Sequence, residues 1–394
     1  MFRRIYLDNS ATTAVDPAVL DEMLPFLRGN FGNASSIHFF GQEARMAVDR
    51  ARHQAAALIN ARANEIVFTS GGTESNNLAI RGLLEANEKH GRHIITSAIE
   101  HSSVKNLCDD LEHRGWHVTR LPVYRNGIVK LDDVKAAIRD DTVLITIMFA
   151  NNEIGTIQPV AEIGRLTAQL RNSGRKIWFH TDAVQAAGKL SVDVEELGCD
   201  LLSFSGHKIH APKGIGALYV RRGVRLHPQI IGGRQERERR GGTEPVPNIV
   251  ALGKACEIAG DRLIADSAAA ASLRDRLEQF VAESIPDHKF NGDRENRLSN
   301  IANISFYGVE GEALLINLDM QGIAISTGSA CSSGSLEPSP VIRALGNEDD
   351  VARTAIRFSF GRENTAEDIE RLLEVLPAAV ENLRRLAPRP ASAR

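Results

Sequence analysis

The segment KIWFHTDAVQAAGKLSVDVEELGCDLLSFSGHK, from Lys176 to Lys208, contains two short apolar runs, and each run ends in polar residues. The first run, KIWFH, leads into Asp182, and the second, DLLSFSG, leads into His207 and Lys208. Continuous apolar runs of this length are typical of strands buried on both faces of a parallel sheet. Since ligands of such sheets bind at the carboxyl ends of the strands, the polar residues that follow the runs are the first candidates for a site.

The same pattern extends over residues 65–220, where β-branched runs alternate with helical segments. This alternation predicts an α/β fold with a large, mainly parallel sheet that is covered by helices on both faces. The other predicted strands are EIVFTS (65–70), HIITSAI (93–99), HVTRLPV (117–123), TVLITIMFA (142–150) and IGALYV (215–220).

The pattern changes after about Ala259 to longer helices with a few strands among them, NIANISFYG, GIAIST and AIRFSFGR. The last helix begins with Thr365 and Asp368 in capping-box spacing. We therefore predict a smaller α+β domain formed by residues 1–14 and 260–394, beside a large domain of residues 15–259.

The composition is that of a globular protein, with 43% apolar and 25% charged residues among 394. A formal net charge of −3 gives no general attraction to nucleic acids or anionic membranes. No apolar run approaches the ~18 residues of a membrane span, so we expect a cytoplasmic protein. The basic stretch GGRQERERRGGT (232–243) contains Glu236 and Glu238 and no aromatic residue. We interpret it as a dimer-interface and phosphate-site loop rather than a nucleic-acid interface.

The four cysteines lie far apart and form no CxxC pair, so neither a metal site nor a disulfide framework is expected. Cys108 and Cys256 lie in helical patterns and Cys199 precedes a strand, which favours small buried hydrophobic residues. Cys331 differs, because it lies in STGSACSSGS (326–335), which is either a plain surface loop or a mobile arm.

Three strand ends carry residues with two interpretations each. Gly71, Gly72 and Thr73 begin a helix after EIVFTS, where they form either a phosphate cradle or an ordinary cap. Asp182 is either a buried carboxylate that needs a cation or a helix cap. Lys208 is either a surface residue or a buried lysine able to form an imine.

Read together, a phosphate cradle, a carboxylate for a ring nitrogen and an imine-forming lysine are the attachments that pyridoxal 5'-phosphate needs. His101 follows the strand HIITSAI, where a flat imidazole could stack on the cofactor ring and move protons. Asn152 adds a polar residue at the same sheet edge. The sequence therefore predicts a pyridoxal-phosphate enzyme.

Eleven stretches between residues 6 and 362 resemble motifs of the cysteine desulfurases, a family within the class V aminotransferase group. The resemblance is to the nitrogen-fixation and iron–sulfur-assembly type, since the RxGxHC-like loop of the other type is absent from this sequence. The stretches are YLDNSATT (6–13), FGNASSIH (31–38), FTSGGTESNN (68–77), EHSSV (100–104), NNEIGTIQP (151–159), HTDAVQAAGK (180–189), SFSGHKIHAPKGIGALYVRR (203–222), RRGGTEPVPNIV (239–250), GSACSSGSLEPS (328–339), VIRALG (341–346) and IRFSFGR (356–362).

The resemblance implies an aspartate-aminotransferase-like fold (fold type I) and a role for each candidate residue. Lys208 would hold the cofactor as an imine, His101 would stack on its ring and transfer protons, and Cys331 would accept sulfur. Asn152 and Arg357 would bind the substrate carboxylate. The implied cofactor-binding residues are Gly72, Thr73, His101, Asn152, Asp182, Gln185, Ser205, His207, Lys208 and, from the second subunit of a homodimer, Thr243.

The implied reaction removes sulfur from L-cysteine, gives L-alanine, and leaves a persulfide on Cys331 for an acceptor such as an iron–sulfur scaffold protein. The loop at about 326–337 would then be a mobile sulfur-carrying arm. A selenocysteine lyase, an aminotransferase and a non-catalytic sulfur carrier are the alternatives. An aminotransferase would not need Cys331, and a carrier would have no use for Lys208. The sequence departs from the family pattern at His210, where the family has tyrosine.

Overall fold

The computed structural model describes residues 4–327 and 338–386 of the chain. Its centre is a seven-stranded sheet in the order β2-β8-β7-β6-β5-β3-β4, in which β8 alone runs antiparallel to its neighbours. All seven strands predicted between residues 65 and 220 are confirmed. They are β2 (Ile66–Thr69), β3 (His93–Ser97), β4 (His117–Leu121), β5 (Thr142–Thr146), β6 (Trp178–Asp182), β7 (Leu201–Ser205) and β8 (Gly216–Val220).

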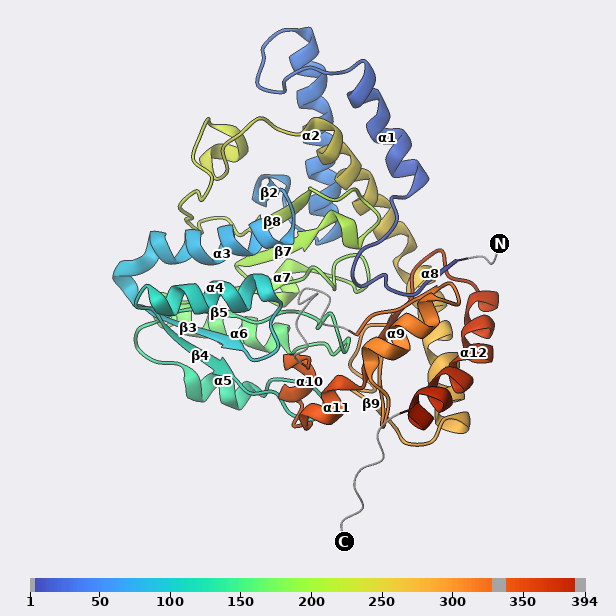
Figure 1. Ribbon diagram of the computed structural model, residues 1–394. Helices are drawn as coiled ribbons and strands as arrows, with labels where there is room; N and C mark the ends of the chain where they lie inside the picture. The colour runs from blue at the N-terminus through green and yellow to red at the C-terminus, as the bar shows by residue number, and fades with distance from the viewer. Residues whose placement is uncertain (1–3, 328–337, 387–394) are drawn as a thin grey trace.

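Alternate side chains of these strands enter two separate apolar cores, as the two-residue period of a strand requires. Ile94 and Leu201 pack with α3 (Gly72–Asn87) and α4 (Ser102–His113) on one face of the sheet. Ile95 and Leu202 pack on the other face. The helices of that second face are α2 (Phe39–Leu58), α6 (Val160–Asn172) and part of α8 (Val246–Ser284). The prediction of a sheet covered on both faces is confirmed (Figure 1).

Two smaller sheets accompany the C-terminal part of the chain. One has the order β12-β10-β9, and the other pairs β1 with β11 in parallel, with Ile5 opposite Ile323. Their strands are β1 (Ile5–Tyr6), β9 (His288–Phe290), β10 (Ile301–Phe306), β11 (Ile323–Ala324) and β12 (Ala355–Ser359). These strands share a third apolar core with α12 (Ala366–Leu386). The predicted capping box of α12 is present, since the Thr365 backbone N–H donates to Asp368 Oδ2 over 3.2 Å and the Asp368 N–H to Thr365 Oγ1 over 3.4 Å.

Helix α8 continues without a break for 39 residues. Gly260, near its middle, has no neighbour within 4 Å of a notional Cβ and does not interrupt the helix. Its first half packs in the core beside α2, and its second half, with Leu277 and Val281, packs in the core beside α12. The expected change of domain between residues 259 and 260 lies inside this helix.

The remaining helices are short, and none of the described helices combines the length and hydropathy of a membrane span. They are α1 (Pro17–Arg28), α5 (Leu131–Ala137), α7 (Val194–Leu197), α9 (Gly311–Asp319), α10 (Pro340–Ala344) and α11 (Asp349–Arg353). Single 3₁₀ turns occur at Ala63–Glu65, Glu88–His90, Gly206–Lys208 and Gln235–Glu238.

Candidate active site

A cavity of about 280 Å³ opens at the carboxyl ends of the parallel strands. It brings together ten of the residues selected from the sequence, although they are spread over almost 300 positions of the chain. These residues are Gly72, Thr73, His101, Asn152, Asp182, Gln185, Ser205, His207, Lys208 and Arg357. Thr243 is exposed and is not among the described residues that line the cavity. Cys331, and most of the loop expected at about 326–337, lie outside the described residues.

One end of the cavity is a cradle between β2 and α3. Gly71 precedes the helix with a φ of 152°, a conformation that L side chains rarely adopt. A Cβ on Gly72 would lie only 2.7 Å from Cγ2 of Val184. The buried Oγ of Ser205 has no hydrogen-bond partner among the described residues. The space left by the missing side chain of Gly72 therefore lies between the first turn of a 16-residue helix and the unpaired Ser205 hydroxyl. The N-terminus of a helix and a hydroxyl group are both suited to binding an anion.

Asp182 ends β6 and is buried, with 5% of its surface exposed. Its Oδ1 accepts from the backbone N–H of Val184 over 2.9 Å, and its Oδ2 accepts from Nδ2 of Asn76 over 2.7 Å. The bond to Val184 closes a turn rather than capping a helix, because the next helix begins only at Val194, and the carboxylate also lines the cavity. The helix-cap interpretation of Asp182 is therefore wrong, and the interpretation as a buried carboxylate remains.

His101 is the N-cap of α4, and its Nδ1 accepts from the backbone N–H of Ser103 over 3.2 Å. Nδ1 is therefore unprotonated, and the proton of the neutral ring is on Nε2. The Ser103 hydroxyl lies 2.8 Å from the same Nδ1 and accepts from Asn76 Nδ2 over 2.8 Å. Through Asn76, a chain of hydrogen bonds links the imidazole to the carboxylate of Asp182.

Sequence reasoning missed Asn76 and Ser103. Asn76 lies four residues after Gly72 on α3, so that both residues are on the same helix face. The four-residue spacing from Gly72 could therefore have identified Asn76 as a residue of the site. Ser103 gave no signal of its own, because a serine in the first turn of a helix is ordinary.

Lys208 lies in the 3₁₀ turn that follows β7. Its Nζ donates to the backbone oxygens of Ser10 and Ala11 over 2.5 and 2.6 Å. The neighbouring ring of His207 is 3.2 Å from Thr12 Oγ1. Burial, followed by the positive charge of Lys208, lowers the pKa of His207 to about 4. His207 is therefore a neutral hydrogen-bonding group at neutral pH.

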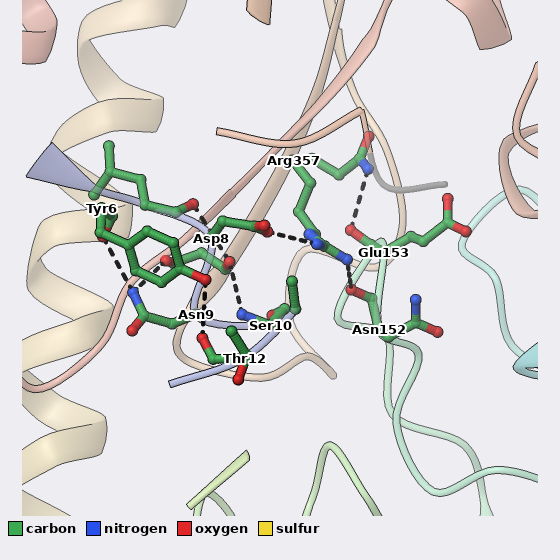
Figure 2. A network of polar contacts seen from close by, with 12 residues as sticks. Tyr6, Asp8, Asn9, Ser10, Thr12, Asn152, Glu153 and Arg357 are labelled. Carbon is green, nitrogen blue, oxygen red and sulfur yellow. Dashed lines mark hydrogen bonds and ion pairs between the residues drawn. The ribbon is translucent and has the colours of Figure 1, made fainter. Parts of the chain in front are cut away.

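Arg357 extends from β12 and lines the cavity, with 2% of its surface exposed. Figure 2 shows its contacts with Asp8 and Asn152. Its Nη1 donates to the backbone oxygen of Asn152 over 2.8 Å, and its Nη2 lies 2.7 Å from Oδ1 of Asp8. Its Nε has no hydrogen-bond partner among the described residues. The guanidinium is thus fixed by two neighbours at the wall of the cavity.

The other three cysteines are buried, as predicted. Desolvation raises the pKa of Cys108 and of Cys199 to about 12, and it raises the pKa of Cys256 as well. Thiolates are the reactive form, so these thiols are inert at neutral pH. His210 is not among the described residues that line the cavity, and its Nδ1 lies 3.1 Å from the carbonyl oxygen of Ala14.

Comparison with known proteins decides the family. The class-V aminotransferase family model matches residues 5–372. The chain is 50% identical over 386 residues to cysteine desulfurase IscS of Methanosarcina thermophila, which covers 98% of this chain and 94% of the relative. The chain belongs to the cysteine desulfurases.

Solved structures agree with this assignment. A NifS-like protein superposes with a TM-score of 0.90 at 36% identity and covers 96% of this chain and 100% of its own. A structure described as SspA in complex with cysteine gives a TM-score of 0.81 at 39% identity, with 92% of this chain and 100% of that chain covered. The class V aminotransferase fold predicted as fold type I is confirmed.

Cysteine desulfurases are pyridoxal-phosphate enzymes, and the cavity of this chain fits that cofactor. The unpaired Ser205 hydroxyl and the cradle at Gly72 suit a phosphate group. The buried carboxylate of Asp182 and the amine of Lys208 line the same cavity. When it is bound, pyridoxal phosphate supplies an electrophilic carbon for amines and a ring that withdraws electrons from the substrate.

Proposed function

We propose that this cysteine desulfurase transfers the sulfur of L-cysteine to the thiol of Cys331 and releases L-alanine. The carbon–sulfur bond of the substrate breaks, a sulfur–sulfur bond forms at Cys331, and the hydrogen of the Cys331 thiol is balanced by the hydrogen gained at the substrate Cβ. Atoms and electrons balance without an external oxidant. The observation that carries the proposal is the convergence of Lys208, Asp182 and His101 on one cavity.

The cofactor's attachments follow from the contacts of each residue. Asp182 would pair with the ring nitrogen, because Asn76 and the N–H of Val184 hold its carboxylate in place. Lys208 would bind covalently and afterwards act as the base at the substrate Cα, since its amine can release the carbonyls of Ser10 and Ala11. Gln185 would donate to the ring hydroxyl. The phosphate would lie in the cradle, bound by Gly72, Thr73, Ser205 and the neutral His207.

His101 would stack on the cofactor ring and move protons at Nε2. Its Nδ1 accepts from Ser103, so the ring proton that it would transfer is on Nε2. The substrate carboxylate would bind the guanidinium of Arg357, which lines the cavity and whose planar fork suits a carboxylate. Asn152 would contribute its side chain, because its backbone oxygen already accepts from Arg357. The cysteine complex of the structural relative supports L-cysteine as substrate.

A homodimer is the proposed assembly. The segment between α1 and α2 presents Phe31 and Ile37 with 75% and 93% of their surface exposed, and Phe39 is 70% exposed. This connection projects from one end of the molecule (Figure 1). Arg45 ties it to the segment that carries Thr243, since its Nε donates to the Ala34 oxygen and its guanidinium pairs with Glu244. One partner surface would therefore cover both segments, which supports a role for Thr243 in the partner's phosphate site.

The segment before Thr243 is held by a buried ion pair. Glu236, Arg237 and Glu238 have positive φ values of 47°, 57° and 66°. Glu236 pairs with Arg52 through bonds of 2.7 and 2.8 Å and accepts from the N–H of Phe68, which lies in β2. The strained backbone is thereby anchored to the strand that leads into the cradle.

Several finer expectations remain proposals. The persulfide of Cys331 would pass to an acceptor such as an iron–sulfur scaffold protein, as the name IscS of the relatives suggests. The division into domains of residues 15–259 and of residues 1–14 with 260–394, and a cytoplasmic location, are predictions from the sequence.

The test is sulfur release from L-cysteine with alanine and protein persulfide measured in parallel. We expect Cys331→Ala to bind the cofactor normally but to form neither persulfide nor alanine at a significant rate. Lys208→Ala should lose both the covalently bound cofactor and turnover. Cys108→Ala is the matched control, because its thiol is buried and inert. Normal sulfur mobilisation by Cys331→Ala would contradict the role of this residue, and normal turnover by Lys208→Ala would contradict the cofactor assignment.

A further inference from the structure

Lys189 is a lysine beside the cofactor cavity to which the proposed reaction assigns no task. It follows the turn after β6, and its carbonyl accepts from Ser267 of α8 over 3.1 Å. Its Nζ donates to Oε1 of Gln185 over 3.0 Å. No carboxylate of the described residues lies within salt-bridge distance of this ammonium group. The amide of Gln185 is therefore the polar partner that the structure gives to it.

The contacts of Gln185 fix the orientation of its amide group. Its Nε2 donates to the backbone oxygen of Ser10 over 2.9 Å, while its Oε1 accepts from Lys189. A carbonyl oxygen can only accept and an ammonium group can only donate. Rotating the amide by half a turn would place donor against donor and acceptor against acceptor. The second hydrogen of Nε2 is consequently available to the cavity that Gln185 lines.

We propose that Lys189 is a positioning residue, which holds Gln185 as a hydrogen-bond donor toward the ring hydroxyl of the cofactor and thereby favours the ionised form of that hydroxyl. The inference rests on the proposed function, in which Gln185 faces this hydroxyl. Without Lys189 the Gln185 oxygen could turn toward the ring instead, and it would repel an ionised hydroxyl. The backbone oxygen of Ser10 accepts from both the Gln185 amide and the Lys208 amine. The same carbonyl therefore positions the group proposed to bind the ring hydroxyl and the group proposed to bind the cofactor covalently.

The charges around Lys189 make its protonation sensitive to pH near neutrality. Burial, together with the cations Lys208 and Arg357, lowers the pKa of Lys189 to about 7. The carboxylate of Asp266 lines the small cavity on the other side of Lys189, but it pairs with Arg362 over 2.8 Å. The carboxylate therefore compensates the charge of Arg362 rather than that of Lys189.

Two histidines also face this region. His207 and His210 both have lowered pKa values, mainly because of burial, with Lys189 among the cations that contribute. His207 therefore adds no positive charge at neutral pH. The hold of Lys189 on Gln185 should be strongest below about pH 7 and should weaken as the ammonium group loses its proton above that pH.

The experiment compares two ligands of the apoenzyme, pyridoxal phosphate and 3-deoxypyridoxal phosphate, which lacks the ring hydroxyl. We expect Lys189→Met to bind pyridoxal phosphate about tenfold more weakly, as the loss of one charge-assisted hydrogen bond predicts. Binding of the deoxy ligand should stay within about twofold of the unmodified enzyme. The midpoint of the pH titration of the bound cofactor's visible absorption should also move upward. Lys189→Arg should restore both properties, because it keeps a charged donor.

Lys213→Met is the matched control, since it removes an exposed lysine beyond the cofactor lysine and leaves Gln185 untouched. Lys189→Gln serves as the second variant if Lys189→Met does not fold, and we expect from it a loss of about threefold, again for pyridoxal phosphate alone. Equal weakening of both ligands, or unchanged binding of pyridoxal phosphate, would overturn the inference. If the unmodified apoenzyme bound neither ligand, the proposed function itself would fail, and that outcome is distinct from the others.

Discussion

Replacing Gly72 by alanine tests the cradle directly. Gly72 is the first residue of α3, and its φ lies outside the positive range, so the backbone itself accepts alanine. The added Cβ would lie 2.7 Å from Cγ2 of Val184 and 3.7 Å from Cβ of Ser205. Carbon atoms in contact prefer separations of about 3.5 to 4.0 Å, so the new methyl group is about 1 Å too close to Val184.

The cost follows from two opposing effects. Overpacking a filled site costs about 1 to 3 kcal/mol, whereas exchanging glycine for alanine in a helix returns up to about 1 kcal/mol. Both Gly72 and Val184 line the cavity, so the displaced atoms are those that surround the bound phosphate. We therefore expect Gly72→Ala to weaken cofactor binding about tenfold, which corresponds to ~1.4 kcal/mol.

The assay is equilibrium titration of the apoenzyme with pyridoxal phosphate for Gly72→Ala, for Val184→Ala and for the double variant. In the double variant the nearest remaining atom of residue 184 is Cβ, at 3.9 Å, which is an ordinary contact distance. The double variant should therefore bind as tightly as Val184→Ala alone. Our reasoning would be refuted if Gly72→Ala bound the cofactor normally, or if the double variant were no better than Gly72→Ala.

Three further changes test other contacts. Arg52→Met removes the ion-pair partner of the buried Glu236 carboxylate. It should lower the free energy of unfolding by about 3 to 5 kcal/mol in guanidinium titrations, and unchanged stability would contradict this. Asp8→Asn keeps an acceptor for Arg357 but removes a negative charge that would repel the substrate carboxylate. The KM for L-cysteine should therefore fall several-fold with kcat unchanged. A rise in KM would contradict this and would show that Asp8 mainly positions the arginine. Glu238→Gly relieves a φ of 66° and removes only an exposed ion pair with Arg234, so it should raise the free energy of unfolding by about 1 kcal/mol. Unchanged or lower stability in the same titrations would contradict this.

The strands and the site residues at their ends were predictable for one physical reason. Strands buried on both faces appear as apolar runs in a sequence. Polar residues such as Asp182 and Lys208 stand out because they come where such runs end. Helix caps with paired side chains, such as Thr365 with Asp368, are equally visible in a sequence.

Other parts of the site had no such signature. The acceptors for Lys208 are backbone oxygens of Ser10 and Ala11, and every residue carries a backbone oxygen. The pairing of Asp8 with Arg357 joins residues 349 positions apart, which no local pattern reveals. The continuity of α8 also depends on tertiary packing, because its two halves are stabilised by different cores.

The N-terminal segment has a consequence for the order in which the site is completed during synthesis. Residues 5–10 leave the ribosome early, yet Ile5 pairs with Ile323, and the backbone N–H of Ser10 donates to the hydroxyl of Ser359 over 2.9 Å. Domains generally fold as the chain emerges, and closing loops of this length costs entropy that only late contacts repay. The cradle and Lys208 can form in a nascent chain, but the wall that contains Asp8 and Ser10 has to wait for the last strand. Full enclosure of the cofactor therefore has to wait until β12 has been synthesised.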